Sequence, residues 1–111
     1  MPETQYQIRG VITEEETGRV IPGLIVRAFD KDLVFDDKLG GATTDQDGSF
    51  HILFGEEDFK DALESKPDLY LRVFDPSGER LILETTDAIR WNASTKEFYA
   101  LKIPARRLQP S

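Results

Sequence analysis

Cysteine is absent from this sequence of 111 residues, and histidine, methionine and tryptophan occur once each. Without cysteine the chain forms no disulfide and offers no thiolate ligand to a metal. A single histidine excludes a zinc site built from several imidazoles. No apolar run approaches the roughly 20 residues of a membrane-spanning helix. The first residues lack the basic and apolar pattern of a secretion signal, so the compartment stays open.

Positive charge is also scarce. Acidic residues number 21 against 14 basic ones, which gives a formal net charge of -7 at pH 7. Nucleic-acid binding normally requires a basic surface, so we expect no nucleic-acid partner. Anionic membrane surfaces repel an acidic protein, and with no apolar span we also expect no membrane insertion. A cation is the partner that this charge favours, although an acidic surface also serves solubility alone.

What the sequence has in abundance is short stretches in which apolar and polar residues alternate. A period of two is typical of strands with one buried face. Residues 24–30 are apolar on both faces, which predicts a central strand. The predicted strands, about seven in number, are at 5–13, 24–30, 42–44, 49–54, 69–75, 80–84 and 96–103. In a chain the length of one domain, this pattern is typical of a mainly β fold, a single antiparallel β-sandwich.

Turn residues and one helical pattern lie between these strands. Residues 45–48, Asp-Gln-Asp-Gly, predict a hairpin turn, and residues 75–78, Asp-Pro-Ser-Gly, predict a β-turn. Phe59, Ala62 and Leu63 follow helical spacing and predict a short helix near residues 56–65. We expect residues 1–4 to be disordered, 5–104 to form the domain and 105–111 to be a linker-like tail.

Four stretches carry a family resemblance. They are G-V-I at 10–12, P-G-L-I-V-R-A-F-D-K-D at 22–32, L-G-G-A-T-T-D-Q-D-G-S-F at 39–50 and D-L-Y-L-R-V-F-D at 68–75. Together they resemble the transthyretin-like or carboxypeptidase regulatory-like (prealbumin-like) β-sandwich, from Tyr6 to about Ile103. The resemblance implies that fold. It also implies a module of the kind found, often repeated, in large bacterial proteins related to toxin complexes.

Clustered aspartates are the candidate metal ligands. Calcium takes six to eight oxygen ligands, which carboxylates on a loop can supply. The candidates are Asp30, Asp32, Asp36 and Asp37 on one charged loop and Asp75 at the end of a later strand. The alternative is a solvated loop whose acids form turns. Val34 and Phe35 depart from the EF-hand pattern, so calcium is predicted only from the density of carboxylates.

No set of catalytic residues is visible. His51 is isolated and lies opposite the apolar side of its strand, and no Gly-x-Ser-x-Gly motif occurs. We therefore predict no enzyme but a non-catalytic structural or protein-interaction module, whose partner is a neighbouring domain or a separate protein. The alternative function is a calcium-binding β-sandwich domain. Trp91 lies in an irregular segment, either as a plug in the core or as an exposed interaction residue.

Overall fold

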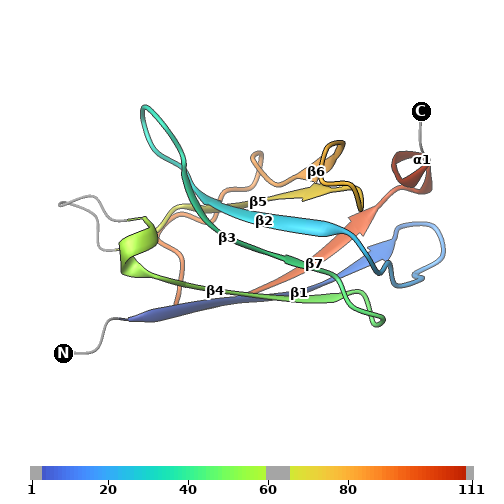
Figure 1. Ribbon diagram of the computed structural model, residues 1–111, viewed down its shortest axis with the longest axis horizontal. Coiled ribbons are helices and arrows are strands. Elements are labelled where there is room, and N and C mark those ends of the chain that lie inside the picture. Colours follow the sequence, from blue (N-terminus) through green and yellow to red (C-terminus); the bar gives the residue numbers. More distant parts are fainter. Residues whose placement is uncertain (1–3, 60–65, 110–111) are drawn as a thin grey trace.

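The computed structural model describes residues 4–59 and 66–109, and in these the chain is mainly β (Figure 1). The described elements are seven strands, one 3-10 turn and one short α-helix. Their bounds are β1 (Gln5–Glu14), β2 (Ile25–Asp30), β3 (Asp37–Thr43), β4 (Ser49–Gly55), η1 (Glu56–Asp58), β5 (Leu69–Phe74), β6 (Leu81–Glu84), β7 (Lys96–Ile103) and α1 (Ala105–Leu108). The predicted mainly β class and the number of strands are confirmed. The division into an N-terminal segment, domain and tail stays a prediction.

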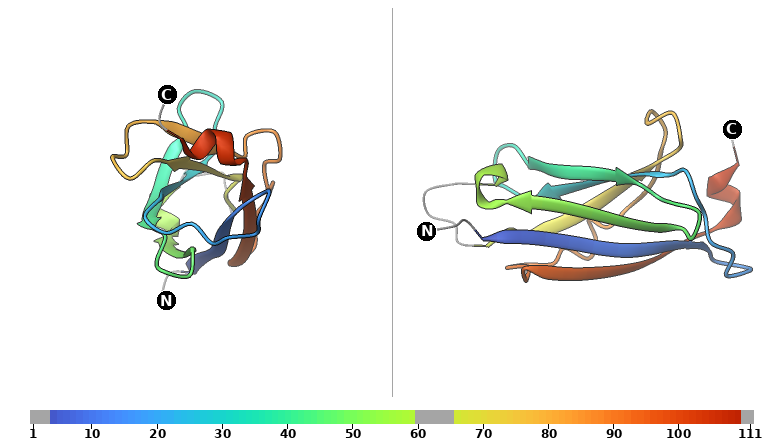
Figure 2. Two further views of the ribbon diagram at one scale, coloured as in Figure 1. Left: turned by 90° about the vertical axis from the view of Figure 1, so that its right-hand side faces the viewer. Right: turned by 60° about the horizontal axis from the view of Figure 1, so that its bottom comes forward.

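The strands form two sheets, which lie on either side of the molecule when it is viewed end-on (Figure 2). One sheet has the order β4-β1-β7 and the other has the order β3-β2-β5-β6. The described strand pairs are antiparallel except β1 with β7, which are parallel from Gln7↔Lys96 to Glu14↔Ile103. A parallel pair needs a long crossover connection, and here the other five strands form that connection. The predicted antiparallel arrangement therefore fails at this one pair.

Both sheets contribute to one hydrophobic core. Alternation along β1 turns Ile8 and Ile12 inward, with 1% and 0% of their surface exposed, while Arg9 between them is exposed. Val26 on β2 and Leu71 on β5 face them from the second sheet and are fully buried. Removal of this apolar surface from water is the main force that holds the two sheets together.

The turn at 45–48 connects the two sheets and does not close a hairpin. Asp45 caps the turn, since its Oδ1 accepts from the amides of Asp47 (2.9 Å) and Ser49 (3.1 Å). Gly48 has a φ of 73°, which suits glycine. The strands on either side, however, pair with different neighbours, β3 with β2 and β4 with β1. The predicted turn is confirmed and the predicted hairpin pairing is wrong, because turn residues determine the local reversal and not the sheet that each strand joins.

Next to this turn, Thr44 links the second sheet to the loop before β2. Its hydroxyl donates to the carbonyl of Ile21 (2.8 Å) and accepts from the amide of Leu24 (3.0 Å). Thr44 is 4% exposed, so both hydrogen bonds lie away from water.

β3 is longer than predicted. It begins at Asp37, inside the segment expected to be a charged loop, and not at Ala42. A register shift between Ala28 and Phe29 lets Asp37 and Lys38 pair with the end of β2. The pair Gly40–Gly41 hides this strand from sequence analysis, because glycine is disfavoured in strands.

The helical segments also differ from expectation. Residues 56–58 form a 3-10 turn that leads into Phe59, which is 2% exposed and packs edge-on against Tyr6 and Phe54. The rest of the predicted helix, residues 60–65, lies outside the described residues. The described α-helix, α1, is in the expected tail, where Arg107 donates to the carbonyl of Ile82 (2.9 Å). No helix among the described residues is long and apolar enough to span a membrane.

Candidate functional site

The outer side of the β4-β1-β7 sheet is a basic surface on an acidic protein. Alternation that turns Ile8 and Ile12 into the core turns the residues between them outward. In the right-hand view of Figure 2 this sheet lies in front, and no described element covers it. We name this surface the basic face and define it by six of its exposed side chains, which are Arg9, His51, Leu53, Lys96, Phe98 and Lys102.

Arg9 lies at the centre of the basic face. Register places His51 of β4 on one side of it and Phe98 of β7 on the other. Gln7 holds both polar neighbours with one oxygen, since its Oε1 lies 3.4 Å from Nε of Arg9 and 3.1 Å from Nε2 of His51. Phe98 is 59% exposed and is an apolar surface beside the guanidinium.

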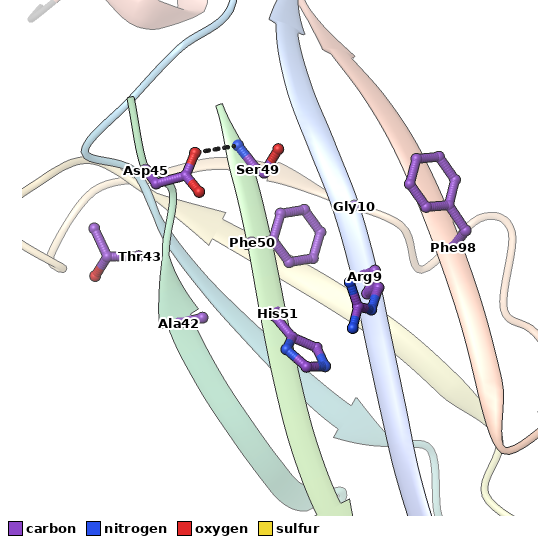
Figure 3. Close-up of a pocket in the computed structure, with 9 residues that line it drawn as sticks. All are labelled: Arg9, Gly10, Ala42, Thr43, Asp45, Ser49, Phe50, His51 and Phe98. Atoms are coloured by element: carbon purple, nitrogen blue, oxygen red, sulfur yellow. Dashed lines mark hydrogen bonds between the residues drawn. The ribbon is translucent and has the colours of Figure 1, made fainter. Parts of the chain in front are cut away.

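A shallow hollow of about 500 Å³ opens at this row of residues (Figure 3). Arg9 and His51 project from neighbouring strands on one side of it, and Asp45 and Ser49 lie at its upper end. A second hollow of about 370 Å³ lies on the other side of Arg9, next to Lys96 and Phe98. Arg9 therefore lines both hollows.

The cations of the basic face are not neutralised by carboxylates. None of the ion pairs between described residues includes Arg9, Lys96 or Lys102. Two carboxylates border the hollows, and both are occupied by other donors. Asp45 caps its own turn, and Glu97 pairs with Arg90 (2.9 Å) and accepts from the amide of Ser94 (2.7 Å).

This arrangement suits an anion with an apolar part. A guanidinium offers planar, charge-assisted hydrogen bonds to a carboxylate, which are stronger than neutral ones. Phe98, which lines both hollows, would contact the apolar part of such a ligand. Nucleophilic catalysis has less support, because the hydrogen bond of His51 goes to Gln7 and none joins it to Ser49.

The structure places the predicted calcium ligands in hydrogen bonds with the chain itself. Asp30 is fully buried and accepts from the amide of Asp68 (2.7 Å). Asp32 accepts from the amide of Leu33 (2.6 Å). Asp37 belongs to β3, where it pairs with Asp30 through the backbone.

Asp36 has three partners within the chain. It accepts from the hydroxyl of Tyr70 (2.5 Å) and the amide of Asp32 (3.0 Å), and Lys31 lies 3.7 Å away. Burial acts to raise the pKa of Asp36, but these donors and the charges of Lys31 and Arg72 outweigh it and lower the pKa. Within the described part of the chain, no three His, Cys, Asp or Glu side chains are grouped to hold a metal ion. Calcium binding at this loop stays a prediction.

The two remaining candidates, Asp75 and Trp91, lie apart from that cluster. Register pairs Phe74 with Ile25, so Asp75 lies at the opposite end of β2 from Asp30. There Asp75 accepts from Ser77 (2.6 Å) and shapes its own turn. Trp91 is 63% exposed, so the alternative in which it fills the core is wrong. Its part in an interaction stays a prediction.

Sequence analysis missed the basic face although its pattern is present. Lys96, Phe98 and Lys102 recur at even spacing in the last strand, and Arg9 lies at an outward position of the first. Only the parallel pairing of these two strands brings the residues side by side, and local sequence does not indicate that pairing.

Comparison with known proteins gives structural neighbours only. No family model matches the chain, and no curated protein sequence matches it. A 9R-lipoxygenase from Cyanothece PCC8801 is similar to it, with a TM-score of 0.70 and 23% identity over 91% of this chain. The match spans 17% of the lipoxygenase. The dioxygenase domain of a dioxygenase carbohydrate-binding protein fusion from Streptomyces sp. SirexAA-E matches with a TM-score of 0.54 and 14% identity. It spans 93% of this chain and 81% of that domain.

These neighbours overturn three expectations from the sequence. They are a lipoxygenase and a dioxygenase domain, and not transthyretin-like or carboxypeptidase regulatory-like domains, so the predicted family is wrong. The prediction of a purely non-catalytic module, and of no enzyme, is corrected by the same finding, because both structural neighbours belong to enzymes. The motifs that suggested the first family are explained by strand and turn formation, which unrelated proteins share.

Iron is the metal that many non-haem oxygenases use, and the residues of this chain do not fit its common ligand set. That set consists of two histidines and one carboxylate. The chain has one histidine, His51, which lies on an exposed strand position next to Arg9. No catalytic step through such a centre can be assigned to these residues.

Proposed function

We propose that this chain is a β-sandwich domain of a dioxygen-using enzyme and that its basic face binds an anionic, partly apolar substrate. Two observations support the enzyme class, the likeness to a lipoxygenase and the likeness to a dioxygenase domain, each over more than nine-tenths of the chain. Two sheets that share one core support the β-sandwich arrangement. We infer that the reaction centre lies in another part of the enzyme, because this chain supplies only one histidine to an iron site.

One observation carries the substrate class. Arg9 is exposed, has no ion pair among the described residues, and lies between two hollows with Phe98 beside it. A carboxylate bound to Arg9 would leave its apolar part against Phe98. An unsubstituted hydrocarbon would not use the guanidinium, and a polyanion would be repelled by the net charge of -7.

The test of the binding site is an NMR titration of the isotope-labelled chain with benzoate and octanoate, against benzyl alcohol and octanol as neutral controls. We expect the carboxylates to shift amide signals of β1, β4 and β7 and the alcohols to bind more weakly. Arg9→Gln removes a charge-assisted hydrogen bond of about 1.5–3 kcal/mol, which lowers affinity about tenfold or more.

Arg106→Gln is the matched control. Arg106 is an exposed arginine on α1, away from the basic face, and has no ion pair with a described residue. We expect it to bind like the unmodified chain. Equal affinity for acids and alcohols, or an Arg9→Gln variant that binds normally, would contradict the proposed site. Dioxygen uptake by the natural full-length protein with the bound acid tests the enzyme class separately.

A further inference from the structure

One long side of β7 is a free strand edge. β7 ends the order β4-β1-β7 and lies below β1 in the right-hand view of Figure 2. At its two ends, the carbonyls of Thr95 and Ile103 accept from the amides of Gln7 (2.8 Å) and Glu15 (2.9 Å). Because backbone groups alternate along a strand, those of residues 96, 98, 100 and 102 face away from β1. Such an edge is able to pair with a strand of another chain.

Arg90 covers part of this edge. Its Nη1 donates to the carbonyl of Phe98 (2.7 Å), which is one of the outward-facing groups. The amide of an added strand would have to approach the same carbonyl at hydrogen-bond distance, about 2.9 Å. The guanidinium already lies there, so Arg90 blocks strand pairing at this residue.

The other contacts of Arg90 hold the guanidinium in this position. Its Nη1 pairs with Glu97 (2.9 Å), and its guanidinium carbon lies 3.7 Å from the ring centre of Tyr99. The backbone of Arg90 exchanges two hydrogen bonds of 2.9 Å with Leu69 at the start of β5. Arg90 therefore extends from one sheet to the edge of the other. A charge-assisted hydrogen bond and a cation–π contact together keep it there.

The free edge of the second sheet has the same feature. β6 ends the order β3-β2-β5-β6, and Arg107 donates to the carbonyl of Ile82 on β6 (2.9 Å). The other two edge strands, β3 and β4, lie against each other, since a Cβ built at Gly40 would lie 3.5 Å from the carbonyl oxygen of Leu53. Each free edge in the described part of the chain therefore has an arginine on a backbone carbonyl.

We propose that the edge of β7 is a strand-addition surface for a second copy of this chain and that Arg90 keeps it closed. In the folded chain the guanidinium excludes the second copy. When Arg90 is removed, two β7 strands pair antiparallel about a twofold axis, so that the same edge is used on both copies.

The sequence of β7 favours one register for this pairing. A twofold axis at Ala100 places Phe98 opposite Lys102 of the second copy, and the outward backbone groups of both residues meet. An axis one residue earlier would place Lys96 opposite Lys102, and like charges directly opposite each other are unfavourable. The favoured register requires the carbonyl of Phe98, which is the carbonyl that Arg90 occupies.

Sedimentation velocity of Arg90→Ala over a range of concentrations, beside the unmodified chain, tests the proposal. We expect the unmodified chain to stay monomeric and Arg90→Ala to form a species of twice the mass as concentration rises. Hydrogen exchange followed by NMR locates the contact. The amides of Phe98, Ala100 and Lys102 should exchange more slowly in the dimer than in the unmodified chain, because only pairing gives them acceptors.

A second change separates edge pairing from lost stability, since Arg90→Ala also removes the ion pair with Glu97. The amide of Ala100 faces away from β1, so Ala100→Pro breaks no bond to β1 but blocks an added strand. Arg90→Ala with Ala100→Pro should be monomeric. If circular dichroism shows that this variant unfolds, Ala100→Lys replaces the proline, because it places two lysines opposite each other at the axis.

Arg19→Ala is the matched control. Arg19 also pairs with a carboxylate, that of Glu14 (3.0 Å), but Glu14 lies on β1, the central strand of its sheet. Its removal opens no strand edge, so this variant should stay monomeric.

Three results would overturn the proposal. They are a folded Arg90→Ala variant that stays monomeric at the highest concentration reached, a dimer that the change at Ala100 does not reduce, and an unmodified chain that already pairs through β7. Slowed exchange on β6 in place of β7 would assign the association to the other edge and would also contradict it. The pairing needs neither Arg9 nor a bound carboxylate, so it fails separately from the proposed function.

Discussion

Gly10 is the glycine at which an added methyl group should lower the stability of the fold most. It lies in the middle of β1, between Phe50 on β4 and Tyr99 on β7. A Cβ built there would lie 2.5 Å from Cε1 of Phe50 and 2.7 Å from the carbonyl oxygen of Tyr99. Both distances are shorter than real Cβ contacts, so the change Gly10→Ala forces neighbouring atoms to move.

The loss of stability can be estimated from how far the atoms around Gly10 are able to move. Overpacking of a core by one methyl group costs about 1–3 kcal/mol. The ring of Phe50 is enclosed at 4% exposure, and the carbonyl of Tyr99 is held in the backbone of β7, so neither can yield easily. We therefore expect Gly10→Ala to lower the free energy of unfolding by about 3 kcal/mol. For a domain of this length that lowers Tm by roughly 12 °C.

Urea unfolding followed by circular dichroism, together with a thermal melt, measures this loss. Gly18→Ala is the control, since its Cβ meets no atom within 4 Å and it adds only the strain of a φ of 77°, about 1 kcal/mol. Phe50→Leu in the Gly10→Ala background should recover part of the lost stability, because leucine is shorter than the phenylalanine ring that the added Cβ would contact. A Gly10→Ala variant no less stable than Gly18→Ala would refute the reasoning.

Four further predictions concern polar groups that are buried or partly buried. Thr44→Val leaves two buried backbone groups without their partner and should lower the free energy of unfolding by about 2 kcal/mol in a urea melt. Burial raises the pKa of Tyr70 and of Tyr99 to about 12. Both raised pKa values favour the neutral tyrosine in the folded state. The stability that they contribute is fully present below pH 10 and should be lost as the pH rises toward 12, and thermal melts across that pH range measure the loss. The Tyr99 hydroxyl is buried without a hydrogen bond to any described residue, so Tyr99→Phe should leave stability unchanged or raise it by about 1 kcal/mol. The pKa of Asp36 is lower in the folded chain than in the unfolded chain, so its charge stabilises the fold at pH values above the unfolded pKa. This stability is lost as the pH falls below about 4, and Asp36→Asn should flatten that loss in acid melts.

Sequence analysis located the strands because alternation is a local property. β1 and β7 were predicted within one residue of their observed ends, since each has a long run of period two. β3 was predicted too short, because Gly40 and Gly41 weaken a strand pattern while suiting the close approach of β4 and β2. The start of β3 depends on a register shift in its partner, which no local pattern reveals.

The predicted function failed where it relied on motifs. The Asp-Gly turn at 45–48 and the strands around it occur in many β proteins, so they indicated a family that the structural neighbours do not support. The aspartates of the loop drew attention by their number. In the folded chain Asp30 and Asp36 are used to hold the loop, which sequence density alone could not indicate.

Composition and alternation by themselves determined that this chain is mainly β, acidic, free of disulfides and unable to supply two histidines to a metal. These properties can be predicted from residue counts and from the pattern of neighbouring residues along the chain. The tertiary structure alone decided that Arg90 reaches the free edge of β7, and that Arg9 lies between His51 and Phe98. Residues from the first and last strands meet there because burial of the shared core selects the parallel pairing, and core burial is a property of the whole fold.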